Sequence, residues 1–126
     1  MASVALQIFI LTKINNKNFR VIIDSGRCVN TVTSGMMTKL GLKIVPHPQS
    51  YKLFWVNSAS INVKEKCLVS IQFVTYLDIW CDVVTMDVGH IILGRSWLYD
   101  LDITVYGRSS SYSFVHNGKK VKLAPT

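Results

Sequence analysis

The chain has 126 residues, which is enough for one domain with a hydrophobic core of its own. Because 49% of the residues are hydrophobic and only 17% are charged, the composition excludes a disordered protein. The apolar run Val4–Leu11 is too short to span a membrane and has no signal-peptide pattern, so no membrane association is expected. We predict one intracellular, cytoplasmic domain over residues 1–126, with a core at 1–108 and a C-terminal hairpin or tail at 109–126.

The net charge of +7 raises the question of nucleic-acid or acidic partners. Aromatic residues are not interleaved with the basic ones as base stacking requires, and basic residues also protect strand edges from aggregation. Nucleic-acid binding is therefore not expected. A small basic β-barrel that binds nucleic acid is kept as a third alternative.

The cysteines and histidines do not form a metal-binding pattern. The cysteines Cys28, Cys67 and Cys81 are odd in number and lack CxxC spacing, which argues against a disulfide framework and a zinc site. We predict three buried free thiols, no metal and no cofactor. His90 is interpreted as a structural residue, with a place beside a functional site as the alternative.

Short apolar runs separated by polar turns predict a protein made mostly of β-strands. A strand at Val4–Leu11 is followed by a turn at Asn15–Asn18. Pro46 and Pro48 are expected to break the chain after the apolar segment Leu42–Val45. Further strands are expected at Phe19–Ile23, Tyr51–Val56, Ile61–Val63, Cys67–Val74, Ile79–Thr85, Ile103–Tyr106, Tyr112–Val115 and Val121–Leu123.

Two short helices are predicted. In the first, at Ser34–Leu40, Ser34 is in position to cap the start and Gly41 to end the helix. The second, at Trp97–Tyr99, follows an apolar run and a glycine. Near the C-terminus, Asn117-Gly118 predicts a two-residue hairpin turn.

The stretch Val21–Gly26 carries the most information about function. Its apolar run delivers the carboxylate of Asp24 to the end of a strand, and Gly26 permits the tight turn that must follow. Ser25 can hydrogen-bond the neighbouring backbone. Asp, Ser and Gly are also common in ordinary turns, so a turn without catalytic function stays an alternative. The succession of apolar strand, glycine and short helix recurs at Ile91–Tyr99, as a site on a pseudo-two-fold axis would require.

The segment Leu53–Lys64 predicts a protruding hairpin. Its small polar tip consists of Asn57, Ser58, Ala59 and Ser60. Such a hairpin either closes over a cleft to exclude water and hold substrate, or is an ordinary surface hairpin.

Three blocks of sequence together resemble the retropepsin-like aspartic proteases, and most of all the protease segment of plant Ty3/gypsy retrotransposon polyproteins. They are Ile22–Gly26 (IIDSG), Ile91–Arg95 (IILGR), and the longer block Cys81–Asp87 (CDVVTMD) with Leu93–Asp100 (LGRSWLYD). The resemblance covers nearly the whole chain. It implies an all-β, closed barrel-like fold with one or two short helices, a homodimer, a polypeptide substrate and no cofactor.

The resemblance also implies roles for individual residues. Asp24 would be the catalytic acid, one from each protomer, and Ser25 and Gly26 would support its loop. Asn57 to Ser60 would form the tip of the flap. The residues that would line the cleft or pack behind the site are Arg27, Ile91, Ile92, Leu93, Gly94 and Arg95.

Arg27 is the main departure from the family pattern, which has a small residue directly after Asp-Ser-Gly. A long guanidinium there would crowd the cleft unless it turns outward. Besides the nucleic-acid alternative, the sequence therefore keeps two functions open. One is an aspartic endopeptidase that cleaves a retrotransposon polyprotein, and the other is a catalytically inactive or domesticated dimeric interaction module.

Overall fold

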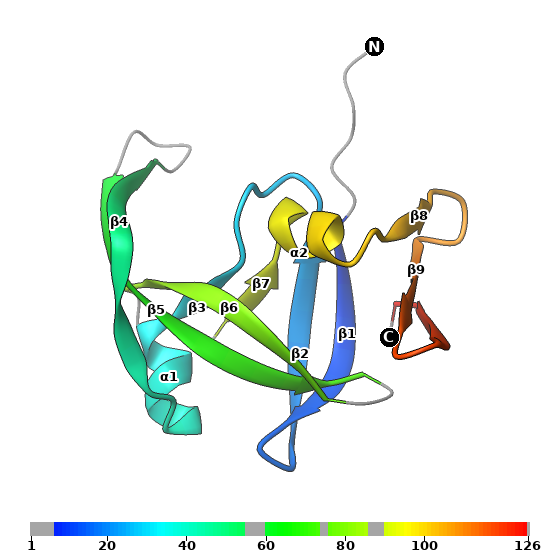
Figure 1. The fold of residues 1–126 in the computed structure, drawn as a ribbon, viewed down its shortest axis with the longest axis horizontal. Coiled ribbons are helices and arrows are strands. Elements are labelled where there is room, and N and C mark those ends of the chain that lie inside the picture. Colours follow the sequence, from blue (N-terminus) through cyan, green and yellow to red (C-terminus); the bar gives the residue numbers. More distant parts are fainter. Residues whose placement is uncertain (1–6, 55–59, 74–75, 86–89, 126) are drawn as a thin grey trace.

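The structure is a computed structural model that describes residues 7–54, 60–73, 76–85 and 90–125 (Figure 1). Strands dominate this part of the chain, and two short helices interrupt them, as predicted. In chain order the elements are β1 (Gln7–Ile14), β2 (Lys17–Asp24), β3 (Thr31–Thr33), α1 (Ser34–Leu40), β4 (Ile44–Phe54), β5 (Ser60–Gln72), β6 (Tyr76–Val84), β7 (Ile91–Leu93), α2 (Arg95–Asp100), β8 (Thr104–Tyr106), β9 (Ser111–His116) and β10 (Lys119–Leu123).

Within the described residues, the larger sheet has seven strands in the order β1-β2-β7-β3-β6-β5-β4. β1 and β2 form a hairpin whose turn residues, Asn15 and Asn16, have φ angles of 53° and 62°. Asparagine tolerates this left-handed conformation better than most residues, so the predicted turn is explained. On its other side β2 runs parallel to β7, and Val21 and Ile23 are fully buried there. The end of β2 therefore lies inside the sheet rather than at its edge.

β4 differs from the prediction because it runs through both prolines. The strand extends from Ile44 to Phe54, and its register against β5 shifts between Pro46 and Tyr51. Among the described strands β4 pairs only with β5, and an irregular edge strand can accommodate residues that lack a backbone N–H. β5 is likewise one continuous strand from Ser60 to Gln72, where two separate strands were expected.

The first helix has the predicted bounds but a different cap. Thr33, not Ser34, is the N-cap residue: its φ and ψ are −80° and 152°, and its hydroxyl accepts from the Met36 N–H at 3.4 Å. Gly41 ends the helix in the left-handed conformation, with φ of 64°, as predicted. Met36, Met37 and Leu40 are buried, so α1 covers the sheet with its apolar face. The second helix, α2, is longer than the predicted Trp97–Tyr99.

A smaller sheet of β8, β9 and β10 packs against the main core through aromatic side chains. The rings of Trp97 on α2 and Phe114 on β9 have centroids 5.7 Å apart, and Phe73 lies 5.6 Å from Trp97. The Asn117-Gly118 turn between β9 and β10 is present as predicted, with positive φ at both residues. In Figure 1 this C-terminal sheet lies at the opposite side of the molecule from the arm made by β4 and β5.

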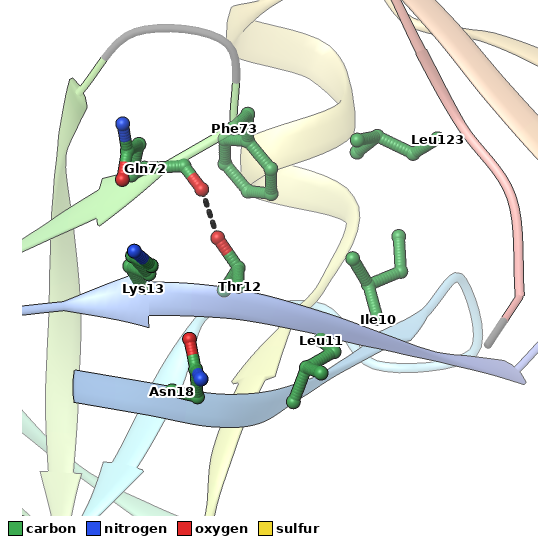
Figure 2. A pocket seen from close by; sticks show the side chains of 8 residues that line it. All are labelled: Ile10, Leu11, Thr12, Lys13, Asn18, Gln72, Phe73 and Leu123. Carbon is green, nitrogen blue, oxygen red and sulfur yellow. Dashed lines mark hydrogen bonds between the residues drawn. The ribbon is translucent and has the colours of Figure 1, made fainter.

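The larger sheet curls so that β1 meets β5. Lys13 pairs with Gln72, and the Thr12 hydroxyl donates a hydrogen bond to the Gln72 carbonyl (Figure 2). A cavity of about 410 Å³ lies beside this junction, lined by residues of β1, Asn18, Phe73 and Leu123. One residue pair joins the two strands within the described residues, so the fully closed barrel stays a prediction.

None of the helices in the described part of the chain is long and apolar enough to cross a membrane.

Candidate active site

Asp24 is placed by the strand that precedes it. It is the last residue of β2, and its two predecessors Ile22 and Ile23 pair in parallel with Ile92 and Leu93 of β7. Because the buried strand fixes the backbone up to this point, the carboxylate is delivered to a defined place where the sheet ends. The Asp24 side chain is 14% exposed, so it is sheltered but still reached by solvent.

The turn after Asp24 folds back onto the carboxylate. The Gly26 N–H donates to Asp24 Oδ1 at 2.9 Å, and the Arg27 N–H donates to the Asp24 carbonyl at 3.1 Å. Ser25 lies half-buried between them. The loop therefore orients one carboxylate oxygen through its own backbone. The second oxygen, Oδ2, faces the Nε of Arg27 at 3.8 Å.

Gly94 supports this loop from behind. A Cβ atom at Gly94 would stand 2.6 Å from the Val29 carbonyl oxygen and 2.7 Å from that of Arg27, which is closer than real Cβ atoms approach backbone. The Arg95 N–H donates to the Arg27 carbonyl at 2.8 Å, and the Ser96 N–H to the Cys28 carbonyl at 3.2 Å. The start of α2 is thus hydrogen-bonded directly to the loop that carries Asp24.

Asn30 is a supporting residue that the sequence analysis missed. It is 6% exposed; its side-chain amide donates to the Trp80 carbonyl at 3.3 Å, and its Oδ1 accepts from the Gly94 N–H at 3.0 Å. Its own carbonyl accepts from the Asp82 N–H at 2.9 Å. Asn30 therefore joins the loop, β6 and the turn before α2. No local pattern signals this role, since its partners lie 50 and 64 residues away in sequence.

Two arginines give the loop a positive charge. The Arg27 side chain is 39% exposed, and a contact of 3.8 Å at that exposure stabilises the fold by about 1 kcal/mol at most. Arg95 is exposed, and its Nη2 lies 2.7 Å from the sulfur of Cys28. Cys28 itself is exposed, so the prediction that all three thiols are buried is wrong for this one. It follows Arg27 in the loop after β2, outside any strand or helix.

Tyr112 is a second residue that sequence reasoning did not connect with the site. It lies on β9 and is fully buried. Burial, and after it the negative charge of Asp24, raises the pKa of the Tyr112 phenol to about 12. The C-terminal sheet thus places an uncharged phenol within electrostatic reach of Asp24. The sequence indicated only that Tyr112 begins a strand.

The remaining predicted site residues fall into three groups. Ile91 and Leu93 are fully buried in the core, whereas Ile92 is partly exposed. Ser60 is the exposed first residue of β5. The other predicted flap-tip residues, Asn57, Ser58 and Ala59, lie outside the described residues. The structure thus brings the Asp24 loop and the Gly94 turn together and leaves the flap tip as an expectation.

His90 contributes through its backbone. Its N–H donates to the Thr33 hydroxyl at 3.0 Å, and its carbonyl accepts from the Thr33 N–H at 3.0 Å, while the side chain is exposed. Within the described residues, no group of three or more His, Cys, Asp or Glu side chains is arranged to hold a metal ion.

A second aspartate, Asp82 on β6, is the centre of a separate polar cluster. The Tyr51 hydroxyl donates to Asp82 Oδ2, and His47 Nε2 lies 3.2 Å from Oδ1. The Gln49 N–H donates to His47 Nδ1 at 3.0 Å, so Nδ1 carries no proton and Nε2 is the donor to the carboxylate. This cluster fastens the irregular part of β4 to β6.

Two buried thiols lie next to the Asp82 cluster. Cys67 and Cys81 stand directly opposite each other on β5 and β6, and both are fully buried, as predicted. Burial, followed by the charge of Asp82, raises the pKa of the Cys67 thiol to about 11, and burial also raises the pKa of Cys81. Both groups are therefore uncharged and poorly reactive thiols at neutral pH.

No protein-family model matches the sequence, and no curated protein matches it. Solved structures do match. The retroviral protease-like domain of Ddi1 from Leishmania major is 11% identical, with a TM-score of 0.67 over 94% of each chain. The chain has the retropepsin-like fold. EIAV protease in complex with the inhibitor HBY-793 is 20% identical, with a TM-score of 0.59 over 79% of this chain and 92% of that one.

A third structure with this fold is the retropepsin-like aspartic protease from Rickettsia conorii. It is 16% identical, with a TM-score of 0.54 over 94% of this chain and 83% of that one. These likenesses establish the retropepsin-like fold of the chain. Its activity has to be argued from Asp24 and the residues around it.

Proposed function

We propose that this protein is an aspartic endopeptidase that works as a homodimer, with one Asp24 from each protomer. The observation that carries the proposal is the position of Asp24 in a retropepsin-like fold. It ends a buried strand, on a loop that Gly94 and Asn30 support from behind. The sequence contains a single Asp-Ser-Gly, whereas the chemistry needs two carboxylates, so a second copy of the chain would supply the other.

In the proposed mechanism the two Asp24 carboxyl groups share one proton, because two like charges so close together cannot both ionise cheaply. The ionised member takes a proton from a water molecule that attacks the scissile carbonyl, and the protonated member donates to the carbonyl oxygen. The titration then belongs to the pair. Gly26 would keep one oxygen of each carboxylate oriented through the hydrogen bond described above.

The proposed substrate is a peptide junction in a retrotransposon polyprotein of the Ty3/gypsy type. The similarity of the IIDSG, IILGR and CDVVTMD blocks to that family supports this origin. We further propose that the protein is a single cytoplasmic domain, needs no cofactor and acts on polypeptide rather than on nucleic acid.

A second candidate function has an observation of its own. Arg27 Nε lies 3.8 Å from Asp24 Oδ2, in the position where the family has a small residue. In a dimer two such guanidinium groups would face one small space. If they hold the carboxylates or fill the cleft, the protein would be a dimeric interaction module with the fold but without the chemistry.

The two functions are separated by a cleavage assay on a mixed peptide library at mildly acid pH and high protein concentration. The assay is run with and without a statine-type transition-state inhibitor, beside the Asp24→Ala variant, and sedimentation establishes the dimer. The endopeptidase predicts inhibitor-sensitive cleavage that the variant lacks. Cleavage that survives in Asp24→Ala would refute the assignment of the acid, and no cleavage by a confirmed dimer would favour the interaction module.

A further inference from the structure

The backbone of Arg27 is fixed by hydrogen bonds on both sides. Its N–H donates to the Asp24 carbonyl at 3.1 Å and its carbonyl accepts from the Arg95 N–H at 2.8 Å. The same carbonyl oxygen packs 2.7 Å from the place a Cβ at Gly94 would take. The loop therefore cannot carry the Arg27 backbone away from Asp24 without breaking both hydrogen bonds and the contact with Gly94.

The Arg27 side chain is more exposed than the Asp24 carboxylate that it faces. It is 39% exposed against 14% for Asp24, and the nearest approach is 3.8 Å, at the outer limit of an ion pair. Because this contact is long and solvated, it is weak, and another carboxylate can compete with Asp24 for the guanidinium. Arginine is suited to that exchange, since its planar fork of N–H donors matches a carboxylate with two parallel hydrogen bonds.

The surrounding charges act in the same direction. The exposed Arg95 is bonded to Arg27 through the backbone, so the loop and the turn behind it carry two cations beside the one carboxylate of Asp24. An extended peptide advances about 3.3 Å per residue. Side chains one or two residues from a scissile bond held at Asp24 would therefore pass within reach of the Arg27 guanidinium.

We infer that Arg27 determines specificity and selects substrates that carry Asp or Glu next to the scissile bond. The inference rests on the proposed endopeptidase and names its substrate class, acidic peptides. Arg27 then takes part in substrate binding. When its guanidinium leaves the Asp24 carboxylate and binds a substrate carboxylate, the acid pair becomes available for chemistry.

The test uses pairs of peptides that are identical except for Glu or Gln at one position within two residues of a cleaved bond. For the wild-type dimer we expect kcat/KM to be about tenfold higher for the Glu peptide, and this preference to shrink as salt screens the charges. Arg27→Gln should abolish the preference, Arg27→Lys should keep part of it, and Arg27→Glu should favour a Lys peptide instead. Arg20→Gln is the matched control, because Arg20 lies on β2 with its guanidinium over the Phe9 ring, 5.6 Å from the centroid.

A binding arm separates this inference from the proposed function. The same peptides, labelled with a fluorophore, are titrated by anisotropy into Asp24→Asn protein with and without Arg27→Gln. Tighter binding of the Glu peptide that depends on Arg27 supports the inference even if no peptide is cleaved, an outcome that would count against the endopeptidase alone. Equal binding of the Glu and Gln peptides, equal cleavage of both, or a preference that survives Arg27→Gln would overturn it.

Discussion

Asp24 and Asp82 are almost equally sheltered, with 14% and 15% of their side chains exposed, yet their surroundings are opposite. Asp82 has a neutral donor on each oxygen, the Tyr51 hydroxyl on one and His47 Nε2 on the other. Asp24 accepts from the Gly26 N–H on Oδ1 and has the Nε of the partly exposed Arg27 side chain 3.8 Å from Oδ2. The burial of a carboxylate therefore does not tell a structural acid from a candidate catalytic one, whereas its hydrogen-bond partners do.

The difference also shows in how each aspartate is held. Asp82 is held by side chains that come from β4 and fasten that edge strand to the sheet. Asp24 is held by the backbone of its own loop, which Gly94 and Asn30 support in turn. A carboxylate whose oxygens are both occupied stabilises the fold. A carboxylate positioned from behind, whose second oxygen has only a long contact with a solvated guanidinium, can still accept a proton from water or substrate.

Replacing each carboxylate by its amide gives the largest expected contrast. Asp24→Asn should lower kcat/KM by about a thousandfold or more, because an amide can neither accept nor donate the catalytic proton. Its free energy of unfolding should change by less than about 1 kcal/mol, since the amide oxygen can still accept from Gly26 and the pair with Arg27 is weak. Peptide cleavage and urea denaturation at pH 7 measure the two effects.

Asp82→Asn should do the reverse. An amide has only one accepting oxygen, so its NH2 group would face either the Tyr51 hydroxyl or His47 Nε2. One hydrogen bond is then lost, and the free energy of unfolding should fall by about 2 kcal/mol. Cleavage by the folded fraction should persist. Asp78→Asn, an exposed site on the same strand, is the control. If Asp82→Asn proved as stable as this control, Asp82 would not be the structural acid that its contacts indicate.

Gly94→Ala tests whether the Asp24 loop is supported from behind. The added Cβ would stand 2.6 Å and 2.7 Å from two carbonyl oxygens, so the backbone must shift and we expect a loss of about 2 kcal/mol together with reduced cleavage. Gly107→Ala is a matched control, because nothing lies within 4 Å of a Cβ there. Equal stability of the two variants in thermal and urea unfolding would show that the loop does not depend on this contact.

The smallest effect concerns alkaline pH. Tyr112 has its pKa raised to about 12 in the folded protein, against about 10 for an exposed tyrosine, so only the unfolded chain releases this proton between those values. The unfolded state then binds fewer protons, and the contribution of Tyr112 to stability is lost as pH rises from about 10 towards 12. Tyr112→Phe should therefore lose less stability over that range than the wild type does, in urea unfolding at stepped pH.

The same titration can be followed by tyrosinate absorbance. Asp24→Asn removes the nearby negative charge and should bring the Tyr112 ionisation to lower pH, whereas Asp82→Asn should leave it in place and act on Tyr51 instead. Tyr99→Phe, at a side chain that is 85% exposed, is the control. An ionisation of Tyr112 that does not respond to Asp24→Asn would separate the C-terminal sheet from the site.

The parts of the fold that follow from local sequence were the parts that could be predicted. Strand β2, the helix Ser34–Leu40, its end at Gly41 and the Asn117-Gly118 turn each depend on neighbouring residues. The N-cap was misplaced by one residue because Thr33 and Ser34 both carry a hydroxyl, and only the backbone angles decide between them. The predicted break at the prolines of β4 was wrong because proline, which ends a central strand, is tolerated in an irregular edge strand.

The geometry of the candidate site could be predicted only as far as its two motifs reach. Asp24 and Gly94 stand in recognisable apolar runs, so their meeting could be expected from a resemblance of motifs. Asn30 and Tyr112 carry no such signal, because their roles depend on partners brought together by the fold. The exposure of Cys28 carries no local signal either, since it depends on where the loop lies in the folded protein.

The bond from Gly94 to Asn30 has a consequence for the order of events as the chain folds. It joins residues 64 positions apart. The hydrogen bonds from Arg95 and Ser96 to the loop also join residues that are distant in sequence. Contacts that close such long loops form late, after local turns and hairpins. During synthesis, Asp24 would emerge and complete its hairpin well before the residues that orient its loop. A polypeptide-cleaving acid built this way would stay idle in the nascent chain and gain its geometry only when most of the domain is complete.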